Sequence, residues 1–138
     1  MADEELLEIG PGTVLRLRVS EDERLEVEAS YDGGGSEPPA HLHPAQDERF
    51  EVLEGTMRAR IGDLESELRA GDELAVPAGT VHQMWNAGAE RAVMLWSTTP
   101  AGRTLDWFRE LAALRAGRPL EDPATLLDRY SDTFRLAG

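Results

Sequence analysis

The stretch HLHPAQDERF, residues 41–50, holds two of the three histidines in a chain of 138 residues. Side chains at positions i and i+2 of a strand point to the same face, about 6.6 Å apart along it. His41 and His43 can therefore converge on one ion. A strand that begins at Glu48 places this carboxylate on one face with Phe50 and Val52. A carboxylate on an apolar face is costly unless it is paired or bound to a cation.

The third histidine lies in VPAGTVHQMWN, residues 76–86. Pro77 and Gly79 predict a tight turn, and His82 opens the strand that follows it. The spacing alone does not decide whether His82 faces His41 and His43.

The rest of the first hundred residues predicts short strands. Residues 13–20 and 24–30 alternate apolar and polar side chains, with the turn SEDE between them. Further short strands, separated by Gly and Pro turns, continue to residue 98 and indicate a β-sandwich or barrel.

After Pro100 the pattern changes to that of two amphipathic helices. The first begins at Thr104 as N-cap and stops at Gly117, and the second runs over residues 122–136 from an Asp122 N-cap with Pro123 at its first position. Their apolar stripes must pack on the strands or on a neighbouring subunit. The members of these stripes are Leu105, Phe108, Leu111, Leu126, Leu127, Tyr130 and Phe134.

The composition excludes several classes of function. The chain has no cysteine and a formal net charge of -13, so we expect no disulfide, no thiolate chemistry, and no binding to nucleic acid or to a membrane surface. It has no lysine for a Schiff base. The acidic start, MADEELLEIG, is unlike a signal peptide, and we expect a cytoplasmic protein.

Ten spaced positions resemble the two motifs of the cupin superfamily, in particular its small single-domain bacterial members. The first motif is matched by Gly35, His41, His43, Glu48 and Gly55, and the second by Gly71, Pro77, Gly79, His82 and Asn86. The resemblance implies an all-β fold, an antiparallel double-stranded β-helix or jelly-roll barrel. We expect residues 1–100 to form this barrel and residues 101–138 to form a helical extension packed on it or on a partner subunit.

The resemblance also implies a metal centre in the barrel. His41, His43, Glu48 and His82 would hold one divalent transition metal ion, leaving two open positions of an octahedron. Three imidazoles and a carboxylate suit Fe, Mn, Ni, Cu, Co or Zn and do not choose among them. Glu48 is also the candidate catalytic residue, as a proton acceptor.

An apolar pocket should lie beside the ion. Strand alternation makes Phe50, Val52, Met57 and Met84 the candidate substrate-binding residues. We interpret Trp85, Trp96 and Trp107 as core or interface residues and Asn86 as a hydrogen-bonding residue.

Three functions fit such a site. The first is a metal-dependent, oxygenase-type enzyme, for instance a dioxygenase, that acts on a small organic molecule. The second is a non-enzymatic small-molecule-binding cupin, and the third is a metal-assisted cyclase or isomerase acting on a polyketide-like substrate. The resemblance further implies a homodimer, which the apolar stripes of the helices would support.

Overall fold

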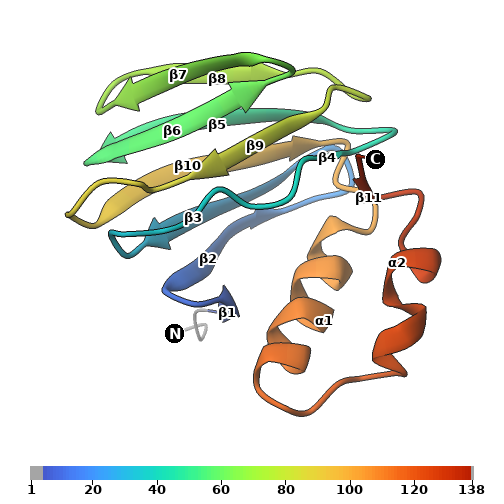
Figure 1. Ribbon diagram of the computed structural model, residues 1–138. Helices are drawn as coiled ribbons and strands as arrows, with labels where there is room; N and C mark the ends of the chain where they lie inside the picture. Colours follow the sequence, from blue (N-terminus) through green and yellow to red (C-terminus); the bar gives the residue numbers. More distant parts are fainter. Residues whose placement is uncertain (1–4, 138) are drawn as a thin grey trace.

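The computed structural model describes residues 5–137 and consists mainly of antiparallel strands in two facing sheets (Figure 1). The larger sheet has the order β1 (Leu6–Gly10), β2 (Thr13–Ser20), β3 (Leu25–Tyr31), β10 (Ala92–Thr99), β5 (Asp47–Glu54) and β8 (Glu73–Val76). The smaller sheet has the order β11 (Arg135–Leu136), β4 (His41–Leu42), β9 (His82–Trp85), β6 (Thr56–Ile61) and β7 (Leu64–Arg69). The predicted antiparallel all-β fold is confirmed.

Two further predictions concern the N-terminal stretch and the boundary between barrel and helices. The start of the acidic N-terminal stretch, residues 1–4, lies outside the described residues. The predicted domain division at residue 100 falls between β10, which ends at Thr99, and the first helix. The division itself stays a prediction.

Alternating side chains build the inner face of the larger sheet, as their period of two predicts. Leu15 pairs in register with Ala29, Ala29 with Met94, and Met94 with Val52. These four side chains form one fully buried row across β2, β3, β10 and β5. Burying a large aliphatic side chain in this way stabilises the fold by about 1.5–3 kcal/mol.

The first C-terminal helix, α1 (Thr104–Arg115), ends where the sequence predicts. Gly117 has a φ of 75°, a left-handed conformation that a residue without Cβ adopts without strain. In this conformation the Gly117 N–H donates to the Leu114 carbonyl, and the next N–H, of Arg118, donates to the Ala113 carbonyl. Trp107 and Phe108 are the large side chains that α1 buries.

The second helix is much shorter than predicted. Asp122 accepts a hydrogen bond from the Ala124 N–H, as expected of an N-cap, and the 3₁₀ turn η1 (Pro123–Thr125) and helix α2 (Leu126–Arg129) follow. The helix then stops, and Arg135–Leu136 forms β11 beside β4. Residues 131–133, Ser-Asp-Thr, favour turns over helix, and β4 offers backbone groups that need a partner. Leu127, predicted in the apolar stripe, is exposed.

Two partners cover the inner face of the larger sheet. The smaller sheet packs on β5, β8 and β10, and its buried contributors include Met57, Ala59 and Leu68. The helical segment packs on β2 and β3 through Trp107, Phe108, Leu126 and Tyr130. Figure 1 shows α1 and α2 at the β1–β3 end of the larger sheet, with β11 between them and β4. None of the helices within residues 5–137 is long and apolar enough to cross a membrane.

Candidate metal centre

The pairing of β4 with β9 brings the three histidines together. His41 and His82 are direct partners in the register, so the structure places His82 opposite His41. Their ring centroids lie 4.5 Å apart, and the ring of His43 lies 5.5 Å from that of His82. One nitrogen from each ring can be chosen so that all three lie within 4.8 Å of one another. This is a cluster suited to a single metal ion.

A glycine turn holds the two histidine segments in place. Gly79 has a φ of 79°, and its N–H donates to the carbonyl of His43 at 2.9 Å. The Ala78 N–H donates to Oδ1 of Asp47, just before Glu48. The turn therefore fastens the start of β9 to the end of β4 and to the start of β5.

Backbone carbonyls fix how each imidazole faces the cluster. Nδ1 of His43 lies 2.8 Å from the Thr133 oxygen, Nδ1 of His82 lies 2.9 Å from the Thr80 oxygen, and Nδ1 of His41 lies 3.3 Å from the Pro39 oxygen. A carbonyl only accepts hydrogen bonds, so Nδ1 of each ring carries the proton. Each Nε2 then presents a lone pair, which is the arrangement found around metal-binding histidines.

Glu48 reaches the cluster from the opposite sheet. Its Oε2 accepts a hydrogen bond from Nε1 of Trp96 at 2.7 Å, and its Oε1 lies 2.8 Å from Nε2 of His82 and 3.2 Å from Nε2 of His43. With the imidazole protons on Nδ1, the buried Oε1 of Glu48 and Nε2 of His43 have no hydrogen-bond partner, whereas a proton on Nε2 of His82 would give Oε1 one. Two lone-pair atoms that face each other repel unless a positive charge lies between them. The donor set therefore fits a divalent transition metal ion.

The ionisation of the cluster follows from burial and mutual contact. Burial alone raises the pKa of Glu48, but its contacts with His82, His43 and Trp96 hold it below its usual value. Burial lowers the pKa of His82, and the Glu48 carboxylate more than offsets this, so the pKa is raised. Burial and the two neighbouring imidazoles lower the pKa of His41 to about 4. Glu48 is thus ionised and His41 neutral, as metal ligands must be.

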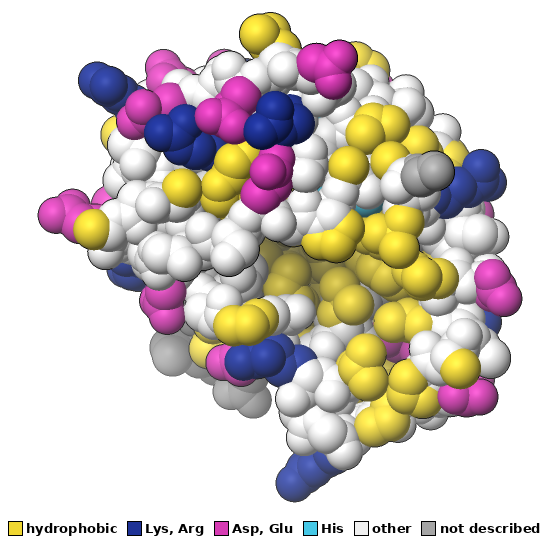
Figure 2. Space-filling view, in the orientation of Figure 1, with side chains coloured by type: hydrophobic (Ala, Val, Ile, Leu, Met, Phe, Trp, Pro, Cys, Tyr) yellow, Lys and Arg dark blue, Asp and Glu magenta, His cyan; other side chains and the backbone are white. Residues whose placement is uncertain are grey.

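A cavity of about 700 Å³ lies beside the cluster, between the two sheets. Figure 2 shows it as a hollow lined by apolar side chains, with a small area of histidine surface near its upper rim. Its apolar lining consists of Ile9, Pro11, Pro38, Met84, Trp85 and Trp96. Of the predicted substrate-binding residues, Met84 lines this cavity. Phe50, Val52 and Met57 lie in the buried core next to it.

Sequence reasoning missed three residues that contact the cluster. Trp96, assigned to core or interface, joins the cavity to Glu48, and alternation along β10 could have placed it on the face of Met94 and Thr98. Phe134 stacks on His41, with ring centroids 4.8 Å apart, and on Trp107 at 4.7 Å. No local pattern predicts that Thr133 and Phe134 return to the histidines, because this contact depends on the path of the whole chain.

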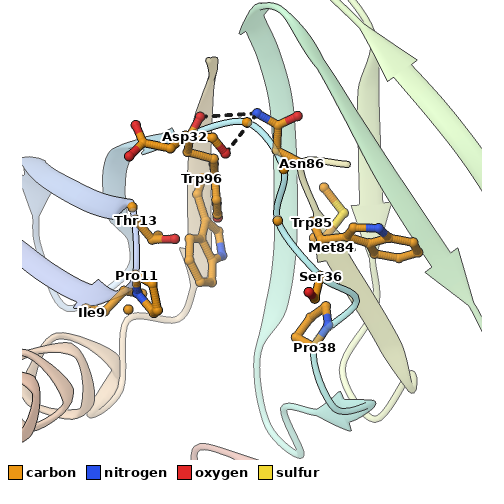
Figure 3. A pocket seen from close by; sticks show the side chains of 16 residues that line it. Ile9, Pro11, Thr13, Asp32, Ser36, Pro38, Met84, Trp85, Asn86 and Trp96 are labelled. Atoms are coloured by element: carbon orange, nitrogen blue, oxygen red, sulfur yellow. Dashed lines mark hydrogen bonds between the residues drawn. The ribbon is translucent and has the colours of Figure 1, made fainter. Parts of the chain in front are cut away.

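Asn86 supports the cavity wall rather than the cluster. Its side-chain amide donates to the carbonyls of Tyr31, Asp32 and Glu90, and its oxygen accepts from the Gly88 N–H. Figure 3 shows the bonds to residues 31 and 32 as dashed lines. Its interpretation as a hydrogen-bonding residue is confirmed.

The family comparison agrees with this geometry. Residues 27–98 match the family model described as "Cupin domain". Among curated proteins, residues of this chain are 34% identical over 63 positions to a protein named an oxidoreductase from Arthrobotrys oligospora. The match covers 45% of this chain and 25% of that protein, so the chain spans about a quarter of the length of this relative.

Solved structures share the fold. KdgF from Halomonas sp. superposes with a TM-score of 0.66 at 17% identity, covering 73% of this chain and 90% of that one. An RmlC-like cupin from Shewanella frigidimarina gives 0.65 at 22% identity, covering 74% and 88%. An oxalate oxidase gives 0.51 at 26% identity, covering 56% and 42%. These likenesses confirm the predicted double-stranded β-helix.

Proposed function

Because the chain belongs to the cupin domain family, we propose that it is a metal-dependent, oxygenase-type enzyme that acts on a small organic molecule. One observation carries the proposal. Oε1 of Glu48 and Nε2 of His43 are buried without hydrogen-bond partners, at the point where His82 also directs its Nε2. Leaving such atoms unpaired costs about 1–3 kcal/mol each, and a bound cation removes that cost.

The four ligands would be His41, His43, Glu48 and His82. A divalent ion such as Fe, Mn, Ni, Cu, Co or Zn supplies a Lewis acid there and, for the redox-active members, an electron-transfer centre. Two comparisons support an oxidoreductase: the Arthrobotrys oligospora relative carries that name, and a structural neighbour is an oxalate oxidase.

The chain's own residues have defined tasks in this proposal. Trp96 holds Oε2 of Glu48 by its N–H, so that Oε1 alone is free to bind an ion or accept a proton from a substrate. The carbonyls of Thr133 and Thr80 keep two imidazoles turned inward. Met84 and Trp96 give the cavity an apolar wall along which an organic molecule can pack.

The test begins with the metal. We expect protein purified without added metal to contain close to one transition metal ion per chain by elemental analysis. When the protein is loaded in turn with Fe, Mn, Ni and Cu, at least one form should consume oxygen with a panel of diketones, flavonols and phenolic acids. Glu48→Gln should abolish both properties, whereas Glu51→Gln, on the same strand but the other face, should change neither. Absence of oxygen uptake in every loaded form would end the oxygenase proposal.

The apolar lining favours a second candidate, a barrel that binds a small molecule without converting it. The cavity lining contains no histidine, lysine or arginine that could carry a proton. Mass spectrometry of a bound compound separates the three possibilities. Two added oxygen atoms indicate an oxygenase; where the mass is unchanged, an altered NMR spectrum indicates an isomerase or cyclase and an unaltered one indicates a binding protein.

A further inference from the structure

The cavity beside the metal centre has the size and the wall of a small-molecule site. Its volume of about 700 Å³ lies within the roughly 300–1,000 Å³ of typical ligand pockets. Trp96 stands on one side of it and Met84 and Pro38 on the other (Figure 3). The indole N–H of Trp96 already binds Glu48, so only the apolar ring remains for a ligand. Trp96 therefore connects the cavity wall to the metal cluster through Glu48.

The charge of the lining restricts what can enter. Asp32 is the one charged residue among the residues that line the cavity, and its carboxylate turns away from the space between Trp96 and Met84 (Figure 3). No cationic side chain of the described residues faces this space. A phosphate, sulfonate or dicarboxylate in the cavity would lose its hydration and gain no cationic side chain in return. The net charge of -13 adds to its exclusion.

The wall offers the hydroxyl of Tyr31, beside those of Thr13 and Ser36, to a ligand. Tyr31 ends the inward-facing series Leu25, Val27, Ala29 on β3, and its side chain lines the cavity. Its hydroxyl has no hydrogen-bond partner within residues 5–137, and it is not among the polar atoms sealed inside the protein. A phenol has an ordinary pKa of about 10, so the hydroxyl is neutral at pH 7 and can donate a hydrogen bond.

We propose that this cavity binds an uncharged, planar ring compound that carries a hydroxyl or carbonyl group. The ring lies along Trp96 and Met84, and the Tyr31 hydroxyl makes a hydrogen bond with the oxygen of the ligand. The direction of that oxygen toward the metal rests on the proposed function, whereas the class of compound rests on the cavity alone. In the chelator-treated protein, small dianions such as oxalate should bind this cavity more weakly than such a compound, because its wall offers no cationic side chain.

Two probes with the same ring test the class of compound. 2-Naphthol is uncharged at neutral pH, and 2-naphthoate carries one negative charge. We expect calorimetric titration of chelator-treated protein to show binding of 2-naphthol and at least tenfold weaker binding of 2-naphthoate. In protein with ¹³C-labelled methionine methyl groups, 2-naphthol should shift the Met84 signal and leave those of buried Met57 and Met94 almost unchanged.

Two variants test the residues named. Tyr31→Phe should weaken 2-naphthol binding by roughly threefold to tenfold, the loss of one hydrogen bond, and leave naphthalene binding unchanged. Ser36→Arg places a cation on the exposed rim of the cavity and should bring 2-naphthoate close to 2-naphthol in affinity. Ser66→Arg, an equal change of charge on exposed β7 away from the cavity, should not.

The outcomes separate this inference from the proposed function. Equal or tighter binding of 2-naphthoate to the unaltered chelator-treated protein, or a Met84 signal that does not respond to 2-naphthol, overturns the inference. If the protein contains no metal but the naphthol results are as expected, the proposed metal-dependent enzyme is contradicted and the ring-binding cavity is supported. If the metal is present but the naphthol results fail, the proposed function survives and the ligand class is wrong.

Discussion

The side chains of the metal centre owe their directions to single contacts with neighbouring residues. A backbone carbonyl near Nδ1 orients each imidazole, and the Trp96 N–H binds Oε2 of Glu48, so that Oε1 is left for other contacts. The resemblance to the two cupin motifs implied which four residues meet, because the spacing alone did not decide whether His82 faces His41 and His43. The sequence did not predict that Trp96 contacts Glu48. The register of β10 against β5, which pairs Thr98 with Glu48, cannot be deduced from either strand alone.

A substitution of Trp96 tests the role of its N–H. Trp96→Phe keeps a ring in the wall but removes the donor to Oε2 of Glu48, so the carboxylate is no longer held in one orientation. We expect the affinity for a transition metal ion to fall by roughly 10–100-fold, the cost of losing an outer partner of a ligand. Competition with a chromophoric chelator measures this. Trp85→Phe, also buried but without that bond, is the control, and equal losses in the two variants would contradict the assignment.

Among the elements, the short C-terminal strand β11 does more than close the smaller sheet. Thr133, just before it, accepts the hydrogen bond from Nδ1 of His43, and Phe134 lies between the rings of His41 and Trp107. The contacts link α1 to the ligands through a chain of stacked rings. The prediction of a helix over 122–136 was wrong here for a physical reason: hydrophobic spacing describes a local face, whereas pairing with β4 is a contact over more than ninety residues.

Truncation of the Phe134 side chain tests whether residues 133–136 position the imidazoles. Phe134→Ala removes the ring that stacks on His41, so this imidazole gains freedom that metal binding must then restrict. We expect the metal affinity to drop by about tenfold and the visible absorption spectrum of the cobalt-loaded protein to change in shape. Leu136→Ala, two residues further along in β11 and half exposed, should leave both unchanged. An unaltered cobalt spectrum in Phe134→Ala would show that the stacking has no effect on the ligands.

The junction of α1 with α2 gives a pH-dependent prediction. Arg129 donates to both carboxylate oxygens of Glu110, at 2.8 and 2.7 Å, and this hydrogen bonding lowers the pKa of Glu110 below its ordinary value. A lowered folded-state pKa adds stability above the unfolded pKa of about 4.3, and the gain is lost as pH falls through the folded value. Glu110→Gln should therefore lower the unfolding free energy at pH 7 by about 0.2–1 kcal/mol.

The same difference should shrink at pH 3.5, which lies below the unfolded pKa of about 4.3, because the carboxyl of the unfolded chain takes up a proton there. Urea unfolding of both proteins at the two pH values measures it. Glu67→Gln serves as the control, because Glu67 is exposed and lies 3.8 Å from its nearest cation, Arg69. A difference between wild type and Glu110→Gln that grows on acidification would refute the assigned pKa direction.

At the scale of the whole molecule, the apolar stripes of the C-terminal helices do not offer the surface that the predicted homodimer needs. Trp107, Phe108 and Leu126 are buried against the chain's own β2 and β3, so the apolar stripes of the helices are largely covered. The homodimer stays a prediction. The strand β1 forms one edge of the larger sheet, lies against α1 and carries the exposed Leu6, and an edge strand can pair with another chain.

Analytical ultracentrifugation at micromolar concentration tests this prediction. We expect the wild-type chain to sediment as a dimer. Leu6→Glu should shift the equilibrium toward the monomer, because it places two like charges at the dimer interface. Leu64→Glu is the matched control, since Leu64 is equally apolar, more exposed, and lies on β7 at the edge of the other sheet. A wild-type monomer at all concentrations would end the proposal.

The return of residues 133–134 to the histidines has a consequence for biosynthesis. The ribosome makes His82 well before it makes Thr133, at roughly 5–20 residues per second. During that interval the nascent chain carries all four ligands, yet the groups that orient His41 and His43 do not yet exist. For the ion binding proposed above, the ring orientations of His41 and His43 are therefore complete only once residues 133 and 134 have been synthesised.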